Sequence, residues 1–86
     1  GNGTYVADAS VEIEGLEETI GSFVNDDERE NIDTLGGLVF VLAGHVPIRG
    51  ELVLHPSGVE FEVLDADPRR IQRMRVRTSN FTNNTV

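Results

Sequence analysis

The chain has 86 residues, no cysteine and a net charge of −8 at pH 7. A chain this short forms one small domain, and without cysteine it has neither disulfides nor a cysteine-based zinc site to reinforce it. Its longest apolar run, residues 38–43, is far shorter than the roughly 20 residues that span a bilayer, and no signal-peptide pattern opens the chain. This composition favours a reducing, cytoplasmic setting, and a start at Gly1 without methionine is typical of a fragment of a longer protein.

The charges are unevenly distributed along the chain. Residues 1–45 carry ten acidic residues against the single Arg29, whereas residues 46–86 carry five acidic residues and six arginines. Lysine is absent, and the arginines are interleaved with acidic residues. Because binding to a phosphate backbone needs clustered basic side chains, we expect no nucleic-acid partner.

The first 24 residues predict a strand and a short helix. Apolar residues alternate with polar ones at Tyr5, Ala7, Val11 and Ile13. This period of two predicts a strand that continues through, or bends near, Ser10. In "GLEETIGSFV", Leu16 and Ile20 lie four residues apart and Gly21 is a natural helix stop, so we expect a helix of two turns.

Residues 25–33, "NDDERENID", are polar except for Ile32 and are expected to form a solvated loop. The next segment, "TLGGLVFVLAG", predicts a helix over residues 34–44 that Asp33 or Thr34 caps. Its glycines, Gly36 and Gly37, are poor helix formers. Because they carry no side chain, we expect them to let the helix lie close to a strand.

The second half predicts three antiparallel strands. Pro47 ends the helical region, and the turn His55-Pro56-Ser57-Gly58 joins residues 52–54 to residues 59–64 in a hairpin. In the last strand, "RIQRMRVR", Arg73, Arg75 and Arg77 share one face while Met74 and Val76 share the other. We expect these arginines to lie across from Glu60 and Glu62, a charge pattern that needs no ligand.

These elements predict an α+β fold, a small sandwich of two short helices on an antiparallel β-sheet. Residues 1–78 are expected to form the domain, and residues 79–86 a flexible C-terminal tail.

Few residues suggest chemistry. Without cysteine, and with two histidines that share no motif with a serine, the chain predicts no catalytic residue and no enzyme. The one dense carboxylate set offers oxygen ligands of the kind Mg²⁺ prefers, although such a run is usually a solvated face; it consists of Asp26, Asp27, Glu28 and Asp33. An anion or an adenine nucleotide is the alternative ligand, held at the helix N-terminus by Thr34, Gly36 and Gly37. Close packing of the glycines explains the same residues without any ligand.

The helix over residues 34–44 is apolar nearly all round. Phe40 and Val41 stand where a helix with one buried face would be polar. Uncovered apolar surface usually marks a contact, so we expect an interaction surface that includes Leu38, Phe40 and Val41. The partner would be another domain of a parent chain or a second copy, which would make a homodimer.

The segments "DTLGGLVFVLAGHVPIRGE" and "GVEFEVLDADPRRIQRMRVR", in this order after the opening strand, resemble the CorC/HlyC transporter-associated domain. The resemblance covers nearly the whole chain and places the glycine pair of that family at Gly36 and Gly37. It implies an accessory domain, neither a pore nor an enzyme, that follows a membrane domain and CBS modules in bacterial magnesium and cobalt efflux proteins and hemolysin-C-like proteins. The fold of that family is likened to part of the FAD-binding domains of some oxidoreductases.

By this resemblance, the chain is expected to be a cytoplasmic regulatory domain on the inner face of the bacterial inner membrane, modulating cation transport through contacts with the CBS and membrane domains of its parent. It would not insert into the membrane itself. A ligand-sensing module for Mg²⁺, Co²⁺ or an adenine nucleotide and a dimerisation unit are the two alternatives.

Overall fold

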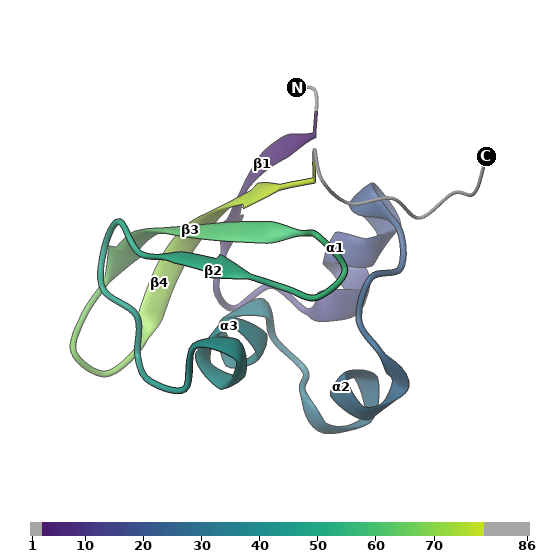
Figure 1. The fold of residues 1–86 in the computed structure, drawn as a ribbon, viewed down its shortest axis with the longest axis horizontal. Coiled ribbons are helices and arrows are strands. Elements are labelled where there is room, and N and C mark those ends of the chain that lie inside the picture. The colour runs from purple at the N-terminus through teal and green to yellow at the C-terminus, as the bar shows by residue number, and fades with distance from the viewer. Residues whose placement is uncertain (1–2, 79–86) are drawn as a thin grey trace.

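The computed structural model describes residues 3–78, which fold into three helices and a four-stranded antiparallel sheet (Figure 1). The elements in chain order are β1 (Thr4–Asp8), α1 (Ile13–Ile20), α2 (Asp26–Asn31), α3 (Leu35–Ala43), β2 (Leu52–Leu54), β3 (Glu60–Ala66) and β4 (Ile71–Arg77). The strand order is β1-β4-β3-β2. The first and last strands of the described chain are therefore neighbours. The expected α+β class is confirmed, with one helix more than the sequence predicted. The tail expected over residues 79–86 lies outside the described residues.

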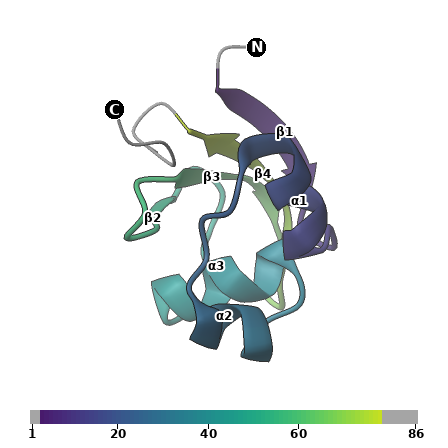
Figure 2. The same ribbon diagram turned by 90° about the vertical axis from the view of Figure 1, so that its right-hand side faces the viewer.

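One face of the sheet carries the core. Buried side chains from β2, β3 and β4, such as Val53, Phe61 and Met74, join buried residues of α1 and α3, such as Leu16 and Leu38, in one apolar cluster. The ribbon shows the helices gathered on this side (Figure 2). The opposite face, which we call the open face, has no element of residues 3–78 packed on it, as its exposed Val6, Leu52 and Leu54 indicate.

The hairpin and the last strand follow the sequence prediction. The His55 carbonyl accepts a hydrogen bond from Gly58 N at 2.9 Å, which closes the expected turn between β2 and β3. On the open face, Arg75 lies 2.7 Å from Glu62, and Arg77 lies 3.1 Å from both Glu60 and Glu62. The predicted cross-strand ion pairs are thus confirmed.

The N-terminal strand is shorter than expected. It ends at Asp8, whose carboxylate accepts hydrogen bonds from the backbone N–H and the hydroxyl of Ser10 at 2.9 and 2.7 Å and turns the chain. The alternation beyond Ser10 reflects only a single bridge between Glu12 and Thr34, and Ile13 already begins α1. The predicted end of this helix at Gly21 is confirmed.

The prediction of a loop over residues 25–33 is wrong in its centre, because residues 26–31 form α2. The Asn25 side chain accepts from Glu28 N, and the Glu28 carboxylate accepts from Asn25 N, which completes a capping box. No residue of α2 is buried. Polar contacts at its ends therefore hold this helix, and apolar periodicity does not reveal it.

The helix predicted over residues 34–44 is confirmed as α3. The Thr34 hydroxyl accepts from Gly37 N at the start, and Gly44 ends the helix with a left-handed backbone at φ 79°. The missing side chain of Gly36 lets α3 lie close to Ala9, because a Cβ at Gly36 would be 2.9 Å from the Cβ of Ala9. The neighbour is the segment that follows β1.

Candidate functional site

The apolar surface predicted on α3 is only partly exposed. Leu38 is fully buried in the core, so its place in an interaction surface was predicted wrongly. Phe40 is 48% exposed and Val41 is 59% exposed. Because successive helical residues are turned by about 100°, these two side chains lie on different flanks of the helix. Phe40 lies on the same flank as Gly36.

The backbone donors at the start of α3 already have partners. Leu35 N donates to the Val11 carbonyl at 2.8 Å, Gly36 N donates to the Ala9 carbonyl at 2.9 Å, and Gly37 N donates to the Thr34 hydroxyl. The helix N-terminus is thus covered by the segment after β1. The expectation that Thr34, Gly36 and Gly37 offer free N–H groups to an anion is not met in this structure.

A cleft of about 660 Å³ opens beside these residues. The end of β1, the start of α3 and the β3–β4 turn form its walls, and its lining includes Ser10, Gly36, Phe40, Arg69 and Arg70. Its size lies in the range of small-molecule pockets, and it is open to solvent. The cleft brings together residues 34–37 and Phe40, which the sequence singled out for two separate roles.

The two arginines at the rim come from the tight turn before β4. The Asp67 carboxylate accepts from the backbone N–H of Arg69 and Arg70 at 2.7 and 3.0 Å. These hydrogen bonds hold the pKa of Asp67 below its usual value. Both guanidinium groups are exposed, and within residues 3–78 neither makes a salt bridge. They are cations that the described fold leaves available.

An acidic group balances this rim. Asp8 also lines the cleft, and the N–H and hydroxyl of Ser10 hold its pKa below the usual value, with a smaller contribution from Arg73 and Arg70. The carboxylate is therefore charged at neutral pH. The rim thus offers two cations and one anion around a partly apolar floor.

The sequence did not single out Arg69 and Arg70. The signal that marks them is "DPRR", two adjacent arginines next to a turn, without acidic residues at cross-strand positions. Arg73, Arg75 and Arg77 were explained by such positions, and the same reasoning leaves these two unexplained.

The acidic segment does not form the expected metal site. Asp26 and Asp27 lie in the first turn of α2, where negative charge favours the helix end, and Glu28 serves the capping box. Across residues 3–78 no group of three or more His, Asp or Glu side chains is arranged to hold a metal ion. The expectation built on Asp26, Asp27, Glu28 and Asp33 is thus not met in the described part of the chain.

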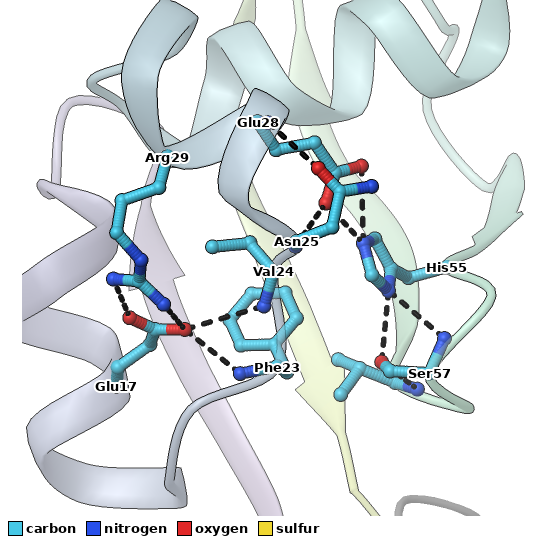
Figure 3. A network of polar contacts seen from close by, with 9 residues as sticks. Glu17, Phe23, Val24, Asn25, Glu28, Arg29, His55 and Ser57 are labelled. Carbon is cyan, nitrogen blue, oxygen red and sulfur yellow. Dashed lines mark hydrogen bonds and ion pairs between the residues drawn. The ribbon is translucent and has the colours of Figure 1, made fainter.

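Glu28 instead reaches a buried histidine (Figure 3). His55 is 4% exposed, and its Nε2 lies 2.9 Å from Glu28 Oε1. Its Nδ1 accepts from Ser57 N at 3.0 Å and lies 2.8 Å from the Ser57 hydroxyl, so the ring proton is on Nε2 and is donated to Glu28. This arrangement joins α2 to the β2–β3 turn, and its partners assign it a structural role.

A second polar contact joins α1 to α2 (Figure 3). The Glu17 carboxylate lies 2.6 Å from Arg29 Nη1 and accepts from the backbone N–H of Phe23 and Val24 at 2.8 and 3.2 Å. Burial raises the pKa of Glu17, but these hydrogen bonds outweigh it and keep the pKa below its usual value. The Glu17 side chain is 7% exposed.

No helix within residues 3–78 has the length and the apolar character that crossing a membrane requires.

Relatives of the chain are known by sequence. Hemolysin C of Rickettsia prowazekii (strain Madrid E) is 39% identical over 82 residues, which cover 95% of this chain but 27% of that protein. A hemolysin C homolog of Rickettsia conorii is 40% identical over the same shares. The chain thus spans about a quarter of the length of the curated relatives it matches.

Solved structures of similar length share the fold. The region of Neisseria meningitidis MC58 named as associated with a Mg²⁺ and Co²⁺ transporter (CorC) is 34% identical, with a TM-score of 0.76 and coverage of 90% of both chains. The CorC_HlyC domain of a Xylella fastidiosa hemolysin, in complex with Mg²⁺ and Mn²⁺, is 27% identical, with a TM-score of 0.69 and coverage of 87% of this chain and 86% of that one.

The family model described as the transporter associated domain, CorC_HlyC, matches residues 1–80. This match covers every helix and strand described above, including the glycine pair of α3 and the arginine-rich β4. The chain belongs to the CorC_HlyC transporter-associated domain family.

Proposed function

We propose that this chain is a regulatory domain of a membrane cation transporter or a hemolysin-like protein, and that it modulates ion transport by contacting other domains of its parent. Support comes from the family and from the cleft, whose lining includes half-exposed Phe40 and the exposed Arg69 and Arg70, neither of which makes a salt bridge within residues 3–78. An exposed apolar side chain and two exposed cations in one cleft suit a protein segment that carries an acidic group. In the parent, the domain would sit at the cytoplasmic face of the bacterial inner membrane, next to CBS modules.

Ion flux in the full-length parent tests this proposal. The parent would be reconstituted in liposomes, and uptake or release of Mg²⁺ and Co²⁺ followed with an enclosed fluorescent indicator. We expect Phe40→Glu combined with Arg70→Glu to change the flux by about threefold or more, because the contact loses its apolar and its charged part. Arg49→Glu is the matched control, since Arg49 is exposed and lies outside the cleft. Unchanged flux after removal of residues 1–78 would refute the proposal.

The cleft supports a second candidate, binding of a small anion such as an adenine nucleotide. The donors would be Arg69 and Arg70, because the N–H groups of residues 35–37 already have partners. We expect ATP without metal to shift the amide resonances of Gly36 and Arg70, and Arg70→Glu to abolish the shift. If the amides stay unshifted at about 5 mM ATP, the Kd lies above the millimolar range and the domain itself is not the sensor.

A further inference from the structure

The open face of the sheet has a regular side-chain pattern across all four strands. In one row, Leu52 of β2 lies beside Glu62 of β3, Arg75 of β4 and Val6 of β1. In the next row, the order is Leu54, Glu60, Arg77 and Thr4. Residues directly opposite one another on neighbouring strands point to the same side of a sheet. Each row therefore runs from apolar through acidic and basic to an uncharged residue.

This face is unusually apolar at its two edges. Val6, Leu52 and Leu54 are 59%, 57% and 62% exposed, and they are half of the large apolar side chains that the described fold leaves exposed. Edge strands that face water usually carry charged residues instead. The charges in the centre are already balanced, because Glu62 pairs with Arg75 and Glu60 with Arg77. A partner can cover such a centre without burying an isolated charge.

The order of the side chains makes each row complementary to its own reverse. Consider a second copy whose open face is stacked on the first. The two copies are related by a two-fold axis that lies between the two sheets, parallel to the strands and above the boundary between β3 and β4. This rotation reverses the order of the side chains in each row. Leu52 then faces Val6 of the second copy, and Glu62 faces Arg75 of the second copy. A third row follows the same rule, because Arg73, which lies between Asp8 and Asp65 in the sheet, then faces Asp65 of the second copy.

We propose that the open face is an interface between two copies of this domain, stacked as a sandwich of two sheets about this two-fold axis. Stacked sheets lie about 10 Å apart with their strands within about 30° of each other, which puts facing side chains in contact. The interface uses the open face, and the cleft, lined mainly by α3 and the β3–β4 turn, shares only Asp8 with it, so this inference does not rest on the function proposed above.

The 86-residue chain is the material for the test, since relatives of the same length have been solved as separate chains. Sedimentation equilibrium would follow the mass from 9.4 kDa toward twice that value as the concentration rises to about 1 mM. We expect Leu52→Asn combined with Leu54→Asn to weaken association by about tenfold or more, and Glu62→Arg to do the same by placing two arginines opposite each other. Glu18→Arg is the control, with the same charge change on an exposed site of α1.

A charge swap distinguishes charges that face each other across the dimer from charges that pair only within one chain. Exchanging all four charges, with Glu60→Arg, Glu62→Arg, Arg75→Glu and Arg77→Glu, restores the ion pairs within one chain and those between two swapped copies, so the variant should fold and associate like the wild type. Mixed with wild type, however, it places Glu against Glu and Arg against Arg. Native mass spectrometry of an isotope-labelled mixture should therefore show far fewer mixed dimers than random pairing gives.

Three results would overturn the proposal. A monomer at about 1 mM means that the open face is covered by something other than a second copy. A dimer that withstands the leucine changes uses another surface. Random mixing of wild-type and swapped chains means that the charges do not face each other in the proposed register.

Discussion

Gly36 and Gly37 stand side by side at the start of α3, yet their surroundings predict opposite results for substitution by alanine. A Cβ at Gly36 would lie 2.9 Å from the Cβ of Ala9 and 3.1 Å from the Ala9 carbonyl oxygen. Neither atom belongs to a flexible side-chain end, so the helix would have to move away. The same movement would stretch the 2.9 Å hydrogen bond from Gly36 N to that carbonyl.

The magnitude follows from three contributions to the free energy of unfolding. Alanine gains about 1 kcal/mol over glycine in helix propensity. Overpacking of a close contact costs about 1 to 3 kcal/mol, and a weakened hydrogen bond costs about 0.5 to 1.5 kcal/mol more. Gly36→Ala is therefore expected to destabilise the domain by about 1 to 3 kcal/mol. In a domain of this size, the melting temperature would fall by roughly 5 to 15 °C.

Gly37→Ala is the matched control. A Cβ at Gly37 would meet the Thr34 hydroxyl at 3.3 Å and a methyl group of Ile32 at 3.4 Å, and both side chains can give way slightly. The helix propensity then dominates, and we expect a change between zero and about 1 kcal/mol of stabilisation. Urea and thermal unfolding followed by circular dichroism would compare the variants. If Gly36→Ala proves as stable as Gly37→Ala, the close approach to Ala9 is not what selects glycine.

Three further substitutions test the polar contacts around α2. Glu17→Gln should lower the free energy of unfolding at pH 7 by about 1 to 3 kcal/mol in urea titrations. The stabilisation by this carboxylate is present above its ordinary pKa of 4.5 and is lost as the pH falls through the lower folded-state pKa, so the two proteins should converge in acid. Asn25→Ala should cost about 1 kcal/mol and speed hydrogen exchange of the α2 amides, which unchanged exchange would contradict. His55→Leu should cost about 2 to 4 kcal/mol in urea, because Glu28 loses its buried partner, and a neutral result would mean that Glu28 is satisfied by water.

Side-chain periodicity predicted the parts of the fold that apolar burial decides. Val59, Phe61 and Val63 alternate with glutamates, and all three are buried in the core. Leu35 and Leu38 define the buried side of α3 in the same way. In these elements the sequence pattern follows directly from the packing, because an apolar side chain on the other face would be exposed to water.

Periodicity failed where polar contacts or long-range pairing decide the structure. α2 buries no residue and exists through its capping box and its contacts to Glu17 and His55, partners that lie far from it in sequence. The spacing Asn25 to Glu28 was the available signal. Similarly, Val11 has the alternation of a strand but pairs with the start of α3, and no local pattern names that partner.

The candidate site was predictable only in its pieces. The sequence marked Phe40 for its apolar exposure and Gly36 for its missing side chain, and both line the cleft. Arg69 and Arg70 reach it because β1 pairs with β4, which brings the end of β1 next to the β3–β4 turn, and this is a property of strand order. A local pattern carries no information about which turn meets which helix.

The two proposed surfaces share only Asp8, and this arrangement leaves the cleft accessible in a dimer. The centre of the open face pairs Glu62 with Arg75 and Glu60 with Arg77, and its edges carry the exposed Leu52, Leu54 and Val6, which suits a copy of itself. The cleft is lined by the exposed Arg69 and Arg70 and by half-exposed Phe40, which suits a different and acidic partner. A dimer formed through the open face would keep both clefts on its outer surfaces, so two parent chains could each engage one.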